Sequence, residues 1–325
     1  MSIPVFHETD LFRPHEDPDD HWDLACQFAL AKRGLIDFQG VLIDFPPNPG
    51  YGDPDIVAVQ QMNYITGLSV PVGVGQKSAQ DRAEGSGVHL LRRVLEAAQD
   101  PVTLHIVGSS RDIALCGKRY PELFRQKVRA IYLNAGSGTN GKYLEYNVEL
   151  DIPSYAGIFD LPCPVYWMPC FHEVAPEMKV GEYGTFFRFL QGDLWKDYRS
   201  EVQNYFVGVL SKRQDGRWLQ ALEGPVDQRL LDYFGKTHRN MWCTGGFLHT
   251  AGLTVNCSGD IVPLGQKPED EVFSFIPVQV SCDEQGRNHW TPCAGSKDRF
   301  LYRVNDQSVY QAAMTRALGE MVSWL

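Results

Sequence analysis

Short, continuous apolar segments recur along this chain and alternate with stretches of helical periodicity. Continuous apolar runs are typical of strands buried on both faces of a parallel sheet, and helical stretches between them imply βαβ units. The sequence therefore predicts an α/β fold with an open, mostly parallel sheet flanked by helices. The expected strands are residues 3–6, 40–45, 70–74, 102–107, 128–133, 164–168, 273–282 and 300–304.

Helical patterns fill the intervals between these segments. The last one, residues 308–325, has a clear amphipathic stripe. No linker or repeat divides the chain, and 325 residues can bury a large core, so we expect a single domain over residues 1–325. The other expected helical regions are 24–35, 55–67, 88–98, 113–115 with a continuation over 121–126, and the aromatic-rich segment 183–233.

An acidic run near the N-terminus places seven carboxylates between Glu8 and Asp23. It follows the first expected strand and precedes the first expected helix, where open α/β sheets have their ligand crevice. Carboxylates crowded there repel one another, and a hard cation such as Ca²⁺ or Mg²⁺ would relieve that repulsion. The alternative is that these residues only complement the dipole of the helix N-terminus.

Composition excludes several classes of partner. The net charge of −10 argues against nucleic acid and anionic membranes, and no apolar run is long enough to span a bilayer. No signal peptide is visible, and none of the eight cysteines forms a C-x-x-C pair. We therefore expect reduced thiols in a cytoplasmic protein, with disulfides in a secreted protein as the alternative.

Two motifs in order carry a family resemblance. The first is Thr9-Asp10 followed by Pro18-Asp19-Asp20, and the second is the stretch EYNVELDIPSYA at 145–156, preceded by a glycine-rich segment. Together they resemble the inosine/uridine-preferring nucleoside hydrolase superfamily. The resemblance implies a Ca²⁺-dependent hydrolase of the N-glycosidic bond of ribonucleosides or related ribosyl compounds. It also implies a role in purine or pyrimidine salvage and assembly into dimers or tetramers.

The resemblance assigns roles to the acidic residues. Asp10 would bind the metal and act as general base on the attacking water. Asp20 would be a bidentate metal ligand, and Asp19 would accept a hydrogen bond from a ribose hydroxyl. The backbone carbonyl of Leu133 or of Asn134 would complete part of the metal shell.

Further residues would hold the sugar. By the resemblance, Glu145 and Asn147 grip ribose hydroxyls, although loop or capping residues would look the same in sequence. After the second strand, Asn48 or Asp44 stands near the place of a sugar-contacting Asn.

The last motif departs from the family pattern. His249 stands where a histidine helps to protonate the leaving base, but Thr250 replaces the metal-binding Asp expected after it, and Glu8 replaces the usual first Asp. A hydroxyl is a weaker Ca²⁺ ligand than a carboxylate. Two alternatives follow: a hydrolase of a different glycoside, or a catalytically silent sugar- or nucleoside-binding protein. A dinucleotide enzyme is disfavoured because no G-x-G-x-x-G follows the first strand.

Aromatic and histidine residues near the motifs admit two interpretations. Any of the aromatic residues could sandwich a leaving base, but core packing is the usual role of such residues. The other histidines are expected to be structural, although His15 and His21 flank the acidic loop. The aromatic candidates are Trp22, Trp167, Trp242 and Tyr183, and the other histidines include His7 and His172.

Overall fold

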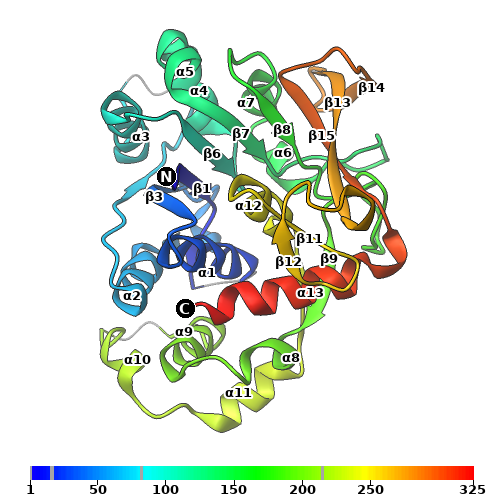
Figure 1. Cartoon of the computed structure of the whole chain (residues 1–325). Coiled ribbons are helices and arrows are strands. Elements are labelled where there is room, and N and C mark those ends of the chain that lie inside the picture. Colours follow the sequence, from blue (N-terminus) through cyan, green and yellow to red (C-terminus); the bar gives the residue numbers. More distant parts are fainter. Residues whose placement is uncertain (1, 15–17, 81–82, 214–215) are drawn as a thin grey trace.

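The computed structural model describes residues 2–14, 18–80, 83–213 and 216–325 (Figure 1). Within these residues, nine strands form one sheet in the order β14-β13-β15-β8-β7-β6-β1-β3-β5. The pairs from β5 to β15 are parallel, and β13 and β14 add an antiparallel edge. The predicted α/β class with an open, mostly parallel sheet is confirmed.

The strands of this sheet are β1 (Ile3–Thr9), β3 (Ile36–Ile43), β5 (Val72–Val74), β6 (Val102–Ile106), β7 (Val128–Leu133), β8 (Val165–Trp167), β13 (Phe273–Cys282), β14 (Asn288–Pro292) and β15 (Arg299–Val304). Three small antiparallel pairs lie outside it among the described residues. They join β2 (Phe12–Arg13) to β4 (Asp53–Pro54), β9 (Phe187–Leu190) to β10 (His238–Met241), and β11 (Leu253–Val255) to β12 (Ile261–Pro263).

Helices cover both faces of the sheet, and Figure 1 shows the two groups on opposite sides. One face packs against α1 (Asp19–Lys32), α2 (Ile56–Thr66), α9 (Ser200–Leu210), α12 (Thr244–Thr250) and α13 (Gln307–Ser323). The other packs against α3 (Ser86–Ala97), α4 (Arg111–Arg119), α5 (Pro121–Lys127) and α7 (Ile152–Ile158). The remaining short helices are α6 (Tyr146–Leu150), α8 (Gln191–Trp195), α10 (Gln220–Glu223) and α11 (Gln228–Gly235).

Burial on both faces follows from alternation along each strand. On β1, Val5 belongs to the core on one side and Phe6 to the core on the other, and both are fully buried. This is why the parallel strands read as continuous apolar runs in the sequence. No helix in the described part of the chain is long and apolar enough to cross a lipid bilayer.

Several expected boundaries were wrong. The second strand begins at Ile36 rather than at residue 40, and the segment 183–233, expected to be helical, contains strand β9. The first helix begins at Asp19 rather than at residue 24, so that two carboxylates occupy its first turn. The expected continuation of one helix over residues 113–126 is instead two helices, α4 and α5, separated at Tyr120. Pro121 opens the second helix because proline has no backbone N–H to donate to the preceding turn.

Backbone hydrogen bonds align the carboxyl ends of the central strands. The amide of Asp44 donates to the carbonyl of Thr9 over 2.8 Å, and the amide of Asn134 donates to Ile106 over 2.9 Å. The residues that follow β1, β3, β6 and β7 therefore meet at one edge of the sheet, which is the position expected for a ligand site in such a fold.

Candidate functional site

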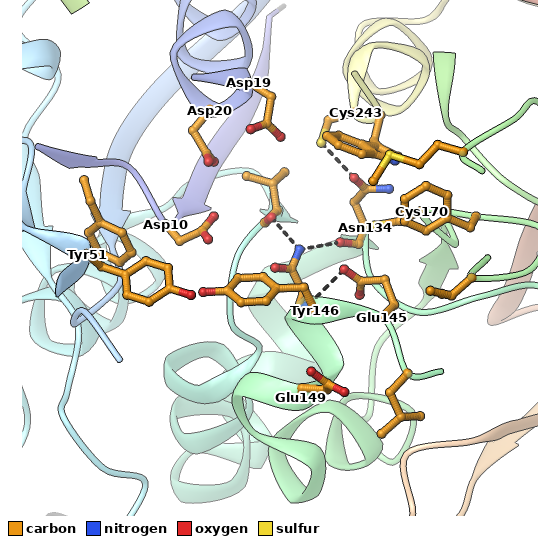
Figure 2. Close-up of a pocket in the computed structure, with 18 residues that line it drawn as sticks. Asp10, Asp19, Asp20, Tyr51, Asn134, Glu145, Tyr146, Glu149, Cys170 and Cys243 are labelled. Atoms are coloured by element: carbon orange, nitrogen blue, oxygen red, sulfur yellow. Dashed lines mark hydrogen bonds between the residues drawn. The ribbon is translucent and has the colours of Figure 1, made fainter. Parts of the chain in front are cut away.

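A cavity of about 440 Å³ opens at this edge (Figure 2). Its walls come from widely separated parts of the chain, and carboxylates, amides and aromatic rings share them. The lining residues are Asp10, Phe12, Asp19, Asp20, Tyr51, Val107, Asn134, Leu144, Glu145, Tyr146, Asn147, Glu149, Cys170, Phe171, Val174, Met178, Trp242 and Cys243.

Three acidic residues of the N-terminal run line the cavity together. Asp10 follows β1, and Asp19 and Asp20 occupy the first turn of α1. Figure 2 shows the three carboxylates directed toward the same space. The hydroxyl of Thr9 donates to Oδ1 of Asp20 over 2.5 Å and fixes that side chain. The structure thus brings together the three acidic residues that the sequence singled out.

The cavity is strongly acidic. Its described lining contains five carboxylates and no Lys, Arg or His. Burial, followed by the charges of Asp10, Asp19 and Asp23, raises the pKa of Asp20 well above its usual value. A cation in this space would therefore relieve both the repulsion and the cost of burying these charges.

Glu145 and Asn147 also line the cavity, and both hold the backbone around it. Glu145 is the N-cap of α6, where it accepts hydrogen bonds from the amides of Gly136 (2.8 Å) and Asn147 (2.9 Å). Burial raises the pKa of Glu145 to about 7. The side-chain amide of Asn147 donates to the carbonyl of Val107 over 2.9 Å. Glu145 therefore combines helix capping with cavity lining, and Asn147 lines the cavity while it anchors the loop after β6.

The two backbone carbonyls considered for a metal shell differ in position. The carbonyl of Leu133 accepts the amide of Met168 over 2.8 Å, and the Leu133 side chain is fully buried in the core. Asn134 lines the cavity, and its carbonyl receives a long contact of 3.4 Å from Nδ2 of Asn147. Of the two alternatives, Asn134 is the one that faces the cavity.

His249 and Thr250 are not among the residues that line the cavity. Nδ1 of His249 lies 2.6 Å from the hydroxyl of Tyr132, and Thr250 Oγ1 lies 3.0 Å from Nε2 of His105 in the core. Both residues belong to the last turn of α12, whereas the start of this helix reaches the cavity. Trp242 and Cys243, which directly precede α12, line the cavity, whereas His249 and Thr250 do not.

Cys243 is part of a buried polar chain. Its thiol donates to Oδ1 of Asn134 over 2.8 Å and also contacts the carboxyl group of Asp23. Burial raises the pKa of Asp23 to about 8, and burial followed by the Asp23 charge raises the pKa of the Cys243 thiol. The thiol is therefore protonated at neutral pH. None of the eight cysteines, all in the described residues, is paired in a disulfide.

The two candidates after the second expected strand are both outside the cavity lining. Asn48 is exposed and caps a 3-10 turn at Pro49–Tyr51 through the amide of Gly50. Asp44 is buried beneath the site, where it accepts the amide of Ser109 over 2.7 Å and contacts Glu8. Sequence reasoning missed the residue of this loop that does reach the cavity, Tyr51.

Aromatic residues form two walls. Phe171 and Trp242 pack edge to face with ring centroids 5.9 Å apart, in a cluster that includes Cys170 and Val174. Tyr51 lies on the other wall with its ring 6.3 Å from that of Tyr146. Among the four aromatic candidates of the sequence, only Trp242 lines the cavity. Trp22 and Trp167 are buried in the core, and Tyr183 packs against Trp290.

The other histidines singled out from the sequence have structural contacts where the structure describes them. His7 is fully buried between Phe38 and Phe247, and Nδ1 of His21 lies 2.7 Å from the hydroxyl of Tyr205. Nδ1 of His172 accepts the amide of Tyr183 over 3.4 Å. His15, Glu16 and Asp17 lie outside the described residues.

The oxygen atoms available in the cavity are the type of ligand that a hard cation prefers. Asp10 and Asp20 provide carboxylates, the carbonyl of Asn134 adds a neutral oxygen, and no cationic side chain competes among the described lining residues. Ca²⁺ takes six to eight oxygen ligands, so water or substrate oxygens would have to supply the rest. Over residues 2–14, 18–80, 83–213 and 216–325, no three His, Cys, Asp or Glu side chains are already arranged to hold a metal ion.

No protein-family profile and no curated protein sequence matches the chain. Solved structures do match it. The inosine-uridine preferring nucleoside hydrolase from Bacillus anthracis gives a TM-score of 0.52 at 11% identity, covering 99% of this chain and 100% of that one. The purine-preferring ribonucleoside hydrolase from Gardnerella vaginalis gives 0.54 at 11%, covering 98% and 99%. An inosine-guanosine nucleoside hydrolase gives 0.54 at 12%, covering 99% of both chains. The chain thus has the nucleoside hydrolase fold over nearly its whole length.

Proposed function

We propose that this protein hydrolyses the N-glycosidic bond of a ribonucleoside or related ribosyl compound. The observation that carries the proposal is the meeting of Asp10, Asp19, Asp20, Glu145 and Asn147 in one cavity on this fold. These residues come from both motifs of the sequence, 125 residues apart between Asp20 and Glu145. The transition state of glycosidic cleavage has positive charge on the sugar ring, which nearby carboxylates stabilise.

Each residue has a proposed role. Asp10 takes the proton of the attacking water as general base. Asp19, Glu145 and Asn147 hold the ribose hydroxyls and fix the sugar relative to the water, which lowers the entropic part of the barrier. Because Glu145 and Asn147 also bind the backbone near β6 and β7, the sugar would rest on groups that have little freedom to move.

Ca²⁺ is the proposed metal, held by Asp10, Asp20 and the carbonyl of Asn134. When bound, such an ion lowers the pKa of a coordinated water and can engage vicinal sugar hydroxyls. Since Cys243, and not a carboxylate, forms the adjacent wall, we expect weaker Ca²⁺ binding than a site with a further carboxylate would give.

The test uses purified protein with inosine, uridine and a nitrophenyl riboside, each with Ca²⁺ and with EDTA. We expect release of base or nitrophenol that EDTA abolishes and that Asp10→Asn lowers at least about 1,000-fold, within the range seen when a catalytic group is removed. No metal-dependent release from any of the three compounds would reject the proposal.

A catalytically silent sugar- or nucleoside-binding protein is the second candidate. It is favoured by one observation, the occupation of a cavity wall by Trp242 and Cys243 without an acid or a metal-binding carboxylate. Calorimetry that detects nucleoside binding by wild type and by Asp10→Asn alike, without turnover, would support it.

Three further properties remain predictions. We propose a cytoplasmic protein that acts in purine or pyrimidine salvage and assembles into dimers or tetramers. Light scattering of the purified protein tests the assembly.

The fold also fits hydrolysis of another glycoside. A thermal-shift screen of sugars with Ca²⁺ would reveal such a substrate.

A further inference from the structure

We infer that the preferred substrate is a cationic N-riboside, in which a heteroaromatic ring such as pyridinium carries the positive charge at its glycosidic nitrogen. This inference rests on the proposed function and specifies its substrate class. Three features of the cavity lead to it: its charge, the lack of a histidine among its described lining residues to protonate the leaving group, and its aromatic walls.

The charge of the cavity favours a cation. Asp10, Asp19, Asp20, Glu145 and Glu149 line it, with no Lys, Arg or His among the described lining residues. Even after a divalent cation binds, the carboxylates outnumber the positive charges. A cationic substrate is therefore attracted, whereas a phosphorylated one is repelled.

A neutral nucleoside poses a second difficulty. Its base departs as an anion unless an acid protonates it, and a general acid raises the reaction rate by about 100- to 10,000-fold. His249 is bonded to Tyr132 outside the cavity. The thiol of Cys243 already donates its hydrogen to Asn134. No histidine in the described lining takes their place.

The other polar groups of the cavity are also committed. Both carboxylate oxygens of Glu145 accept backbone amides. The hydroxyls of Tyr51 and Tyr146 are hydrogen-bonded to each other, which uses the hydrogen of one of the two. The described lining residues therefore bind and position a substrate, and they offer one phenol hydroxyl but no imidazole to protonate an anionic base.

A cationic N-riboside needs no such donor. The bond between C1′ and the ring nitrogen breaks, and its electron pair moves to the nitrogen, which changes from positively charged to neutral. The oxygen of water forms the new bond to C1′, and its proton passes to the carboxylate of Asp10. The products are ribose and a neutral heteroaromatic, so atoms and charge balance without any further reactant.

The aromatic walls fit the same ligand. Trp242 and Phe171 form one wall, and the stacked rings of Tyr51 and Tyr146 form the other. A cation over an aromatic face is attracted by the negative face of the ring, most strongly with Trp. A flat, positively charged heteroaromatic would obtain both this attraction and the burial of its apolar edge.

The experiment compares kcat/KM for N-ribosylpyridinium, its phosphate monoester, inosine and a nitrophenyl riboside under identical Ca²⁺ concentrations. We expect N-ribosylpyridinium to exceed inosine by at least about 100-fold, the lower bound of the missing acid contribution, and its phosphate monoester to be the poorer substrate. The nitrophenyl riboside is uncharged with a good leaving group, so a rate between those of the other two unphosphorylated substrates supports the inference.

Variants separate charge from leaving-group ability. Glu149→Gln removes an exposed carboxylate from the cavity and should lower kcat/KM for N-ribosylpyridinium several-fold more than for the nitrophenyl riboside. Glu320→Gln, an exposed position on α13 outside the cavity, is the matched control and should change neither. Inosine turned over as well as N-ribosylpyridinium would overturn the inference but keep the proposed function. No turnover of any compound would overturn both.

Discussion

The thiol of Cys243 donates a hydrogen bond to Oδ1 of Asn134 over 2.8 Å, and both residues line the cavity. Asn134 is a proposed metal ligand, so a single short contact joins it to a neighbouring lining residue that carries a thiol and not a carboxylate. Changing this contact should change the affinity for Ca²⁺.

Cys243→Asp is expected to tighten Ca²⁺ binding by about tenfold, which corresponds to about 1.4 kcal/mol. Without the metal, the same variant should be less stable than wild type because it adds a buried carboxylate next to Asp23. Calorimetric titration with Ca²⁺ and urea unfolding in EDTA measure the two effects. Cys243→Asn is the neutral control.

Thr250→Asp supplies the contrasting case. Thr250 is buried and pairs with His105, away from the cavity, so this variant should lose stability and gain no Ca²⁺ affinity. If Thr250→Asp bound Ca²⁺ more tightly than Cys243→Asp, the assignment of the cavity wall to Cys243 would be wrong.

Acid should destabilise the fold through His7. Burial lowers the pKa of His7 from 6.5 to about 3, so between these values the unfolded chain binds a proton that the folded chain does not. The free energy of unfolding therefore falls as the pH falls, by about 2 kcal/mol from this residue at pH 5. His7→Phe, between Phe38 and Phe247, should reduce this loss in urea unfolding at pH 7 and pH 5.

The exposed His238→Gln is the control for that experiment. It should leave the difference between pH 7 and pH 5 unchanged. An equal pH dependence in wild type and His7→Phe would show that His7 is not buried in its neutral form.

Asp23 should act in the opposite direction. Burial raises its pKa from 3.8 to about 8, so the folded protein holds a proton that the unfolded chain releases. Stability from this residue is therefore lost as the pH rises, by about 2 kcal/mol between pH 6 and pH 8. Asp23→Asn should flatten this dependence in EDTA, whereas the exposed Asp160→Asn should not.

Trp242 should contribute to substrate binding. Trp242→Ala is expected to lower kcat/KM by about 10- to 100-fold because it removes a large aromatic surface from the wall, whereas Trp242→Phe should cost only a few-fold. Trp22→Phe is the comparison in the core, where Trp22 stacks on Phe206 with centroids 4.1 Å apart. That variant should lower Tm and leave kcat/KM unchanged; a similar fall in kcat/KM from changes at both positions would contradict the assignment.

The sheet was predictable because burial on two faces leaves a signal in the sequence. Strands such as Val102–Ile106 and Phe273–Cys282 are apolar or alternate clearly, and both were expected. The strand His238–Met241 was not, because its polar side chains carry no such pattern. It leads directly into Trp242 and Cys243, so the wall of the cavity that it positions was missed too.

The site was predictable where a motif fixed the spacing. Asp10, Asp19 and Asp20 meet because a strand end and a helix start are adjacent in space. The resemblance assigned His249 and Thr250 to the site, but neither residue lines the cavity. Thr250 follows Cys243, which does line the cavity, by seven residues. Seven residues make about two helical turns, or about 10 Å, and a sequence match cannot tell which end of a short helix faces a ligand.

The cavity draws its walls from residues as far apart as Asp10 and Cys243, and this has a consequence for how the protein acquires activity. No short segment of the chain carries the site, so binding competence cannot appear until β1, β6 and β7 have paired and α12 has docked. Parallel pairing of distant strands is a slow step in folding. During refolding, recovery of ligand affinity should therefore trail recovery of helical signal, which makes the ligand a reporter of the last assembly step.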